Sequence, residues 1–269
     1  MAISGRSRLV VAVAGTDSWM RPDLIKLLTR AGMDVRAMGA GSASLFGVDV
    51  LVLVPAIAPL SGSAGRDVGV SAANITFSAM TVSNVPRAVV VSRLGSDAES
   101  PNEYLAALGD LERRASVATS KLTLIRLAHP FGPPDRPGPL VNAAASFSTG
   151  GEPSPDNQAM VQPVYLEDAV ALVLAGLDGR IGSGAVELGG PETMPFRDFA
   201  KLAASVSEPP KRRFGWGLPS GRRRYRQAMG GLLAANSVAA RKFAPPFEPE
   251  LRGPTEVWRD RRSREELPS

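Results

Sequence analysis

Residues 10–28 read VVAVAGTDSWMRPDLIKLL, and this stretch decides the fold. Its first residues are β-branched or small and apolar, which is typical of a parallel strand buried on both faces. After a short turn, Leu24, Leu27 and Leu28 recur at helical spacing, and Gly32 stands where helices commonly end. A strand, a tight turn and a helix in this order hold the pyrophosphate in dinucleotide-binding folds. This turn, however, contains one glycine where such turns contain several.

Strands and helices alternate along the rest of the body. We expect strands at 8–14, 33–38, 48–55, 86–96 and 121–134, and helices at 19–31, 70–82 and 101–119. This alternation predicts an α/β fold in which helices cover both faces of a doubly wound, Rossmann-like parallel sheet. The predicted dinucleotide-binding core spans residues 1–132.

The next part of the chain predicts a smaller unit beside the core. Residues 133–155 are rich in Gly, Pro and Ser, so we expect a loop there. Residues 161–179 and 185–206 each predict an extended piece followed by a helix. They predict the remainder of the fold and a small C-terminal substrate-side lobe within 133–210. A basic C-terminal segment follows at 211–269.

Composition excludes several classes of site. The 269 residues include no cysteine, so the chain can form no disulfide, thiolate nucleophile or cysteine-ligated metal site. His129 is the only histidine, which excludes a metal site with several histidine ligands. We therefore expect no metal. No apolar run is long enough to cross a bilayer, and we expect a cytoplasmic protein.

Positive charge is concentrated at the end of the chain. Residues 211–269 carry 14 of the 31 Lys and Arg residues but only 6 of the 26 Asp and Glu residues. Three hypotheses stay open for residues 211–242. They form a solvated helix of the lobe, lie peripherally on the anionic inner face of a membrane, or dock an acidic protein partner. Nucleic acid is the least favoured partner because no nucleic-acid-binding motif is present. The oligomeric state is not defined by the sequence.

The order of these motifs resembles the atypical (extended-type) short-chain dehydrogenase/reductase superfamily. Within it, the chain is most similar to the NAD(P)-binding group that includes NmrA-like regulators and a complex I accessory subunit. Five stretches carry the resemblance: VAVAGTDSWMRPDL, VDVLVLVPA, VPRAVVVSRLGS, LTLIRLAHPFGPP and VQPVYLEDAVALVL…VELGGPE. Together they extend over about residues 8–206, in the order of the family.

The resemblance implies a cofactor, NAD or NADP, at the turn after the first strand. Its cofactor-binding positions correspond to Ala14, Gly15, Thr16, Asp17, Pro55, Ala56, Ser92 and Pro130. In the family, glycines let the backbone approach the pyrophosphate. Here Asp17 puts a carboxylate close to that phosphate, and the short connection after the second strand lacks the edge strand that family members place near the adenine. Dinucleotide binding is therefore expected to be weak or lost.

The resemblance also implies a catalytic tyrosine with a lysine four residues later, which lowers the pKa of the tyrosine. Tyr104 matches the tyrosine, but Leu108 occupies the position of the lysine. Ser92 matches a polar contact to substrate, or is a turn residue. His129 is the remaining candidate for proton transfer, or has a structural role. Arg126 is expected to neutralise a nearby carboxylate.

These observations favour a protein that keeps the fold while its catalytic pair is lost. The expected role is non-catalytic: ligand binding, regulation or service as an accessory subunit. The alternative is an NAD(P)-dependent oxidoreductase or epimerase that acts on a small or sugar-like substrate. The altered turn and Leu108 argue against the enzyme, whereas the loop around His129 argues for it.

Overall fold

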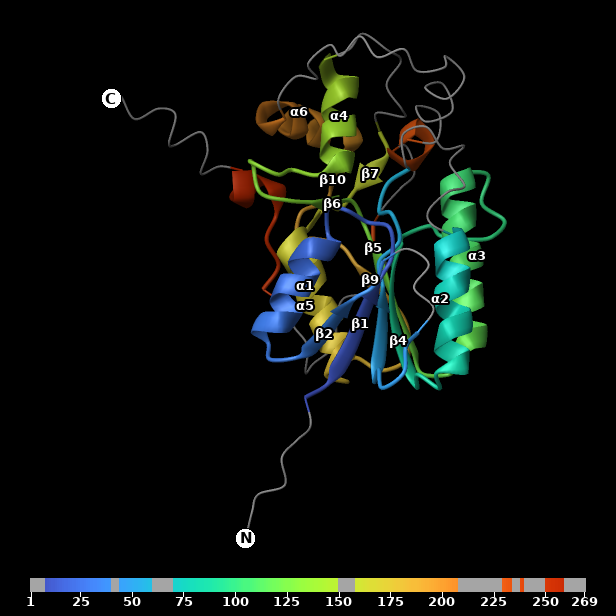
Figure 1. Ribbon diagram of the computed structural model, residues 1–269. Coiled ribbons are helices and arrows are strands. Elements are labelled where there is room, and N and C mark those ends of the chain that lie inside the picture. Colours follow the sequence, from blue (N-terminus) through green and yellow to red (C-terminus); the bar gives the residue numbers. More distant parts are fainter. Residues whose placement is uncertain are drawn as a thin grey trace, which may run out of the picture.

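A six-stranded parallel sheet forms the centre of the protein (Figure 1). The structure, a computed structural model, describes residues 8–39, 44–59, 70–149, 158–207, 229–233, 238–239 and 250–258. The strands of the sheet lie in the order β2-β1-β3-β4-β5-β9, and every pairing is parallel. Their bounds are Val10–Ala14 (β1), Asp34–Ala37 (β2), Val50–Leu53 (β3), Arg87–Arg93 (β4), Leu122–Leu127 (β5) and Gly184–Leu188 (β9). The predicted doubly wound α/β fold is confirmed.

Two helical layers cover the sheet. Helices α1 (Arg21–Arg30) and α5 (Leu166–Leu177) lie on one face, and α2 (Val70–Val82) and α3 (Glu103–Ala118) lie on the other (Figure 1). Side chains of β1 alternate between the two layers, because successive residues of a strand point to opposite faces. Val11 and Val13 pack in the cluster that contains α1 and α5, and Ala12 and Ala14 pack in the cluster that contains α2.

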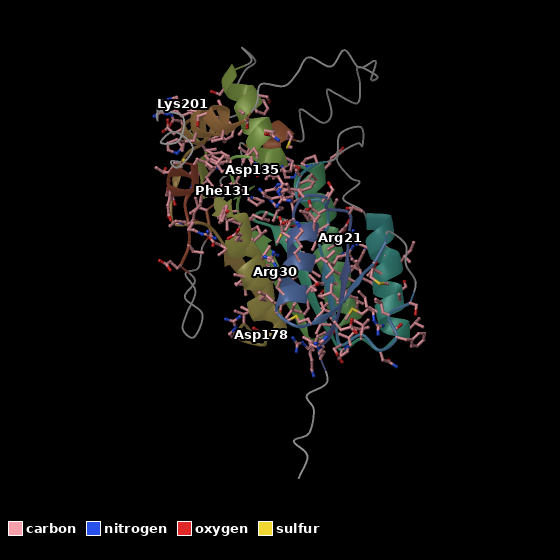
Figure 2. All side chains as sticks on the ribbon, turned by 60° about the vertical axis from the view of Figure 1, so that its left-hand side comes forward. Arg21, Arg30, Phe131, Asp135, Asp178 and Lys201 are labelled. Atoms are coloured by element: carbon pink, nitrogen blue, oxygen red, sulfur yellow. The ribbon has the colours of Figure 1, made fainter. Side chains whose placement is uncertain are left out.

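A lobe stands at the carboxyl ends of the strands (Figure 1). It contains helices α4 (Pro139–Thr149) and α6 (Phe196–Val206), which pack on each other. Four two-residue strands form two separate small sheets beside it. Strand β6 (Pro130–Phe131) pairs with β8 (Val164–Tyr165), and β7 (Met160–Val161) pairs with β10 (Met194–Pro195). Figure 2 shows Phe131 and Asp135 toward this end of the molecule and Asp178 at the opposite end.

Two expectations about the second part of the chain are wrong. Helix α4 occupies the middle of the segment that was expected to be a loop, because Pro139 is tolerated in the first turn of a helix and the small apolar residues after it pack against α6. Strand β9 belongs to the central sheet beside β5 and not to the lobe. Its register with β5 joins Leu127 to Leu188, so the C-terminal part of the chain completes the sheet.

The connection between β2 and β3 supports the expectation of a missing edge strand. Strand β2 itself lies at the edge of the sheet, and residues 44–49 of the connection form turns and no strand.

Helix α1 begins at Arg21, two residues later than expected, because the side chain of Asp17 holds the preceding residues in a turn. None of the described helices is both long and apolar enough to span a membrane.

The basic C-terminal segment is described only in pieces. Residues 211–228, 234–237 and 240–249, which include most of the expected partner or membrane contact, lie outside the described residues. Met229, Leu232 and Leu233 are buried in the lobe, so this apolar stretch packs inside the protein. Trp258 is also buried there, where its indole Nε1 donates a hydrogen bond of 3.0 Å to the carbonyl oxygen of Gly132.

Candidate functional site

The turn after β1 passes very close to the end of β3. Gly15 has φ +121°, and a Cβ atom added to it would lie 1.9 Å from the carbonyl oxygen of Val54. That oxygen accepts the backbone N–H of Asp17 at 3.3 Å. Only glycine tolerates both this φ and this distance. The single glycine of the turn is therefore required for the backbone approach between two neighbouring strands.

The Asp17 carboxylate occupies the N-terminus of α1. Asp17 is 6% exposed, and its Oδ1 accepts the backbone N–H groups of Trp19, at 3.0 Å, and of Met20. Its Oδ2 accepts the N–H of Ile57 at 3.3 Å, from the segment after β3. Free N–H groups at a helix N-terminus are the groups that bind phosphate in dinucleotide folds. Here the chain supplies its own anion to these groups.

The electrostatic balance at Asp17 has two opposing causes. Burial raises the pKa of its carboxyl group above the ordinary value of 3.8. The backbone N–H groups of Met20, Ile57, Trp19 and Arg21 oppose this rise because they stabilise the ionised form. Burial has the larger effect, so the ionised form of Asp17 is less favourable in the folded protein than in water.

Trp19 and Arg136 form one wall of the site. The Trp19 indole Nε1 donates to the carbonyl oxygen of Arg136 at 3.3 Å, and Arg136 Nη1 donates to the carbonyl oxygen of Trp19 at 3.4 Å. Arg136 also forms an ion pair with Asp23 of α1. A Cβ on Gly132 or Gly138 would lie 2.9 or 2.7 Å from the indole, so these glycines let the loop before α4 pack against Trp19.

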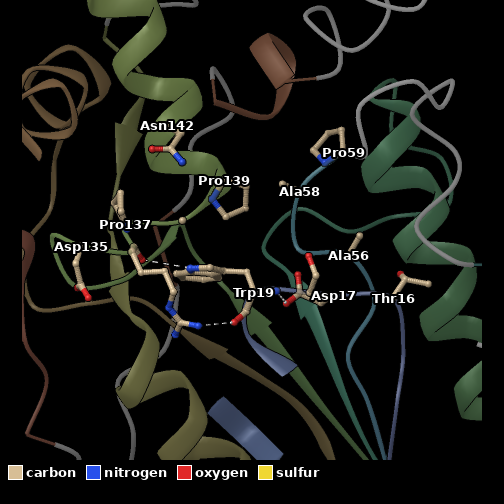
Figure 3. A pocket seen from close by; sticks show the side chains of 13 residues that line it. Thr16, Asp17, Trp19, Ala56, Ala58, Pro59, Asp135, Pro137, Pro139 and Asn142 are labelled. Carbon is tan, nitrogen blue, oxygen red and sulfur yellow. Dashed lines mark hydrogen bonds between the residues drawn. The ribbon is translucent and has the colours of Figure 1, made fainter. Parts of the chain in front are cut away.

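A pocket of about 510 Å³ lies between the turn, the segment after β3 and the loop before α4 (Figure 3). Its lining residues are Thr16, Asp17, Ser18, Trp19, Ala56, Ala58, Pro59, Asp135, Arg136, Pro137, Gly138, Pro139 and Asn142. The volume is within the range of roughly 300–1,000 Å³ that is common for small-molecule sites. The lining includes two carboxylates, a guanidinium and an amide, which suit a polar ligand.

The predicted cofactor positions divide into two groups. Thr16, Asp17 and Ala56 line the pocket, and Ala14, Gly15 and Pro55 are next to them in the chain. Ser92 and Pro130 are buried and do not line it. The described residues contain no cluster of side chains that could hold a metal ion.

Tyr104 is enclosed by the protein. Its side chain is 0% exposed, and its hydroxyl group donates a hydrogen bond of 2.9 Å to the carbonyl oxygen of Ala56. Burial raises the pKa of Tyr104 far above its ordinary value of 10. Leu108, at the position of the family lysine, is fully buried on the same helix. The charge of Arg93 opposes this rise but does not offset burial, and Leu108 supplies no positive charge of its own, so the phenol stays protonated at pH 7.

The other two catalytic candidates are also buried. The Ser92 hydroxyl group lies 3.1 Å from that of Ser96, with which it shares a hydrogen bond. His129 is 0% exposed, and neither of its ring nitrogens has a hydrogen-bond partner among the residues that the structure describes. Burial, and then the charge of Arg93, lower the pKa of His129 well below 6.5. The imidazole is therefore neutral at pH 7 and is not in a position to exchange protons with solvent.

Sequence reasoning missed Arg93, Trp19, Arg136 and Asn142. The signal for Arg93 was a charged residue inside an otherwise apolar strand, which is rare in a buried position. Trp19 and Arg136 contact each other across 117 residues, and no local pattern predicts such a contact. The expectation for Arg126 is confirmed, because it forms a salt bridge of 2.5 Å with Glu112 of α3.

Comparisons with known proteins agree on the architecture. No protein-family model and no curated protein matches this sequence. Among solved structures, MoeE5 in complex with UDP-glucose and NAD is 15% identical, with a TM-score of 0.55 over 74% of this chain and 81% of that chain. TunA, an NAD-dependent NDP-hexosamine 5,6-dehydratase involved in tunicamycin biosynthesis, is 18% identical, with a TM-score of 0.55 over 85% of this chain and 96% of that chain.

A dTDP-4-dehydrorhamnose reductase from Bacillus anthracis in complex with NADP is 13% identical, with a TM-score of 0.56 over 74% of this chain and 80% of that chain. Two of these three proteins are thus described as enzymes, a dehydratase and a reductase, and two were determined with NAD or NADP. At these identities the likeness shows the fold alone, and the chain shares with these proteins a Rossmann-like parallel α/β sheet.

Proposed function

We propose that this protein binds a small polar ligand in the pocket beside Asp17 and has a regulatory or accessory role without hydride transfer. The observation that carries the proposal is the Asp17 carboxylate, which accepts the N–H groups of Trp19, Met20 and Ile57. A pyrophosphate at the N-terminus of α1 would compete for these donors and would be repelled by the carboxylate. NAD and NADP are then bound weakly or not at all.

The environment of Tyr104 supports the absence of hydride-transfer chemistry by the usual route. A general acid or base has to reach the substrate within hydrogen-bonding distance, and its pKa has to lie near the working pH. Tyr104 is buried, donates to Ala56 and has a raised pKa. Leu108, at the position of the family lysine, supplies no positive charge that would lower the pKa of Tyr104.

The alternative function is that of an NAD(P)-dependent oxidoreductase or epimerase with a small or sugar-like substrate. The neighbours described above favour it, since MoeE5 and the reductase were determined with NAD and NADP, respectively. The position of the pocket favours it as well, because ligands of open α/β sheets bind beyond the carboxyl ends of the strands. In that case Asp17 would have to leave the helix N-terminus when the cofactor binds.

Calorimetric titration of the protein with NAD⁺, NADH, NADP⁺ and NADPH tests the proposal. We expect no saturable binding at micromolar concentrations by the parent protein and a gain in binding by Asp17→Gly and Asp17→Asn, since both remove the negative charge. Asp34→Asn is the matched control, because Asp34 is an exposed acid on β2 and should not affect binding. A dissociation constant in the low micromolar range for the parent protein would contradict the proposal and favour the enzyme.

A further inference from the structure

Arg93 ends β4 with its guanidinium in the protein interior. The residue is 1% exposed, and within the described part of the chain neither Nε nor Nη1 has a hydrogen-bond partner. These two atoms carry three of the five N–H donors of an arginine. No carboxylate among the described residues forms an ion pair with Arg93.

His129 is near enough to this cation for the charge of Arg93 to lower the pKa of the imidazole. The register of β4 and β5 joins Arg93 to Leu127, and His129 follows two residues later. Its two ring nitrogens are buried, and no described residue forms a hydrogen bond with them. A neutral imidazole offers one N–H donor and one acceptor. Unpartnered donors from two neighbouring strands therefore gather at the carboxyl ends of the central strands.

The groups around Arg93 do not neutralise it. Burial lowers the pKa of Arg93 to about 10, which leaves the guanidinium charged at pH 7. Tyr104 and His129 interact with it electrostatically, but burial raises the pKa of the phenol and lowers that of the imidazole, so both are neutral. Water could satisfy the hydrogen bonds but would leave the buried charge uncompensated, which is costly. An anion would satisfy both requirements.

We propose that Arg93 and His129 form a buried binding site for a small anion, either a short carboxylate or an inorganic oxyanion. The guanidinium provides charge and N–H donors, and the imidazole provides one more donor. Carboxylate and phosphate oxygens are the acceptors that arginine binds most strongly.

This site is distinct from the turn that Asp17 occupies. Arg93 and His129 do not line the pocket. The two regions adjoin through Tyr104, whose hydroxyl group donates to Ala56, a residue of the pocket wall. Anion binding at Arg93 and His129 therefore does not depend on whether the pocket accepts a dinucleotide.

Thermal unfolding in the presence of defined anions tests the proposal. The protein is dialysed into sodium gluconate, whose anion is much larger than formate or acetate, and is then titrated with formate, acetate or inorganic phosphate at constant ionic strength. We expect a saturable rise in melting temperature with at least one of these anions. Arg93→Met should lose the rise. Arg87→Met is the matched control, because Arg87 stands at the other end of β4 and donates to carbonyl oxygens that end α5.

Two results would overturn the proposal. One is a parent protein whose melting temperature responds to the three anions no more than to gluconate, as expected if a carboxylate outside the described residues neutralises Arg93. The other is an Arg93→Met variant that responds as the parent protein does. If Arg93→Met does not fold, saturation-transfer NMR on the parent protein with formate or acetate, displaced by phosphate, decides the question. No transfer would reject the site.

Discussion

The backbone N–H of Ile57 donates a hydrogen bond of 3.3 Å to the Asp17 carboxylate. This bond joins the segment after β3 to the turn after β1, at the point where those two strands diverge to their helices. The same carboxylate accepts the N–H groups of Trp19 and Met20. One side chain therefore shapes the turn and fills the anion position of the fold. The residue that we propose to weaken cofactor binding is therefore also a structural residue of the turn.

The free energy of unfolding of the Asp17→Asn variant should increase, relative to that of the parent protein, as the pH rises. The folded protein holds the proton of Asp17 more tightly than the unfolded chain does, because burial raises the pKa above 3.8. The stabilisation from the protonated group is complete below 3.8 and is lost as the pH rises through the folded pKa. Each unit of raised pKa corresponds to about 1.4 kcal/mol. Asparagine does not titrate and keeps one oxygen acceptor.

Urea unfolding of both proteins between about pH 4 and pH 7 measures this difference. Asp34→Asn, an exposed substitution on β2, should show no comparable trend. A parent protein that gains stability over Asp17→Asn with rising pH would mean that the backbone N–H groups stabilise the ionised carboxylate more than burial destabilises it.

Tyr104→Phe should lower the free energy of unfolding by about 1 kcal/mol, because it removes the hydrogen bond to the Ala56 carbonyl oxygen. Any reductase or epimerase activity should be nearly unchanged. Tyr165→Phe is the control, since the Tyr165 hydroxyl has no hydrogen-bond partner among the described residues and should cost less. A loss of activity of several hundredfold in a folded Tyr104→Phe protein would show that the tyrosine is catalytic.

The stability of the protein should fall as the pH decreases below about 6.5, and His129 should be a cause. Its pKa is lowered by burial and by Arg93, so below 6.5 the unfolded chain takes up a proton that the folded protein excludes. The loss should approach about 1.4 kcal/mol per pH unit from this residue. His129→Leu should remove this part of the pH dependence. Since the chain has no other histidine, an unchanged profile in the variant would contradict the assignment.

The central sheet could be predicted because its signals are local. Helix α2 begins and ends at the expected residues, and the first four strands lie within three residues of their expected bounds. Strand β5 begins one residue later than expected and ends at Leu127, where the proline-rich part of the expected range 121–134 follows. Except for the exposed edge strand β2, these strands are rich in buried apolar residues, and period and composition distinguish them from the helices. Helix α4 was missed because Gly and Pro around Gly138 and Pro139 indicate a loop, while packing against α6 decides for a helix.

The site could be predicted in part. The sequence located Gly15, Thr16 and Asp17 at the turn, because the order of strand, turn and helix is a local pattern. It did not indicate that the Asp17 carboxylate would bind the helix N-terminus, since that depends on the φ of Gly15 and on the distance to Val54. The contact of Trp19 with Arg136 depends on the complete fold.

Gly15→Ala should therefore be far more destabilising than Gly32→Ala. Both glycines have positive φ, +121° and +81°, so alanine is strained at either position. At Gly32 nothing lies within 4 Å of the new Cβ, and the cost should be about 1–2 kcal/mol from the backbone alone. At Gly15 the Cβ would lie 1.9 Å from the Val54 carbonyl oxygen, and neither backbone can move without separating β1 from β3.

We expect Gly15→Ala to lose at least about 3 kcal/mol in urea unfolding, or to yield no folded protein, because the clash adds to the backbone strain. The circular dichroism spectrum of Gly32→Ala should match that of the parent protein. Equal losses in the two variants would show that the turn can move away from Val54. Such a movement would also release Asp17 from the helix N-terminus, because the N–H of Asp17 donates to the same Val54 oxygen.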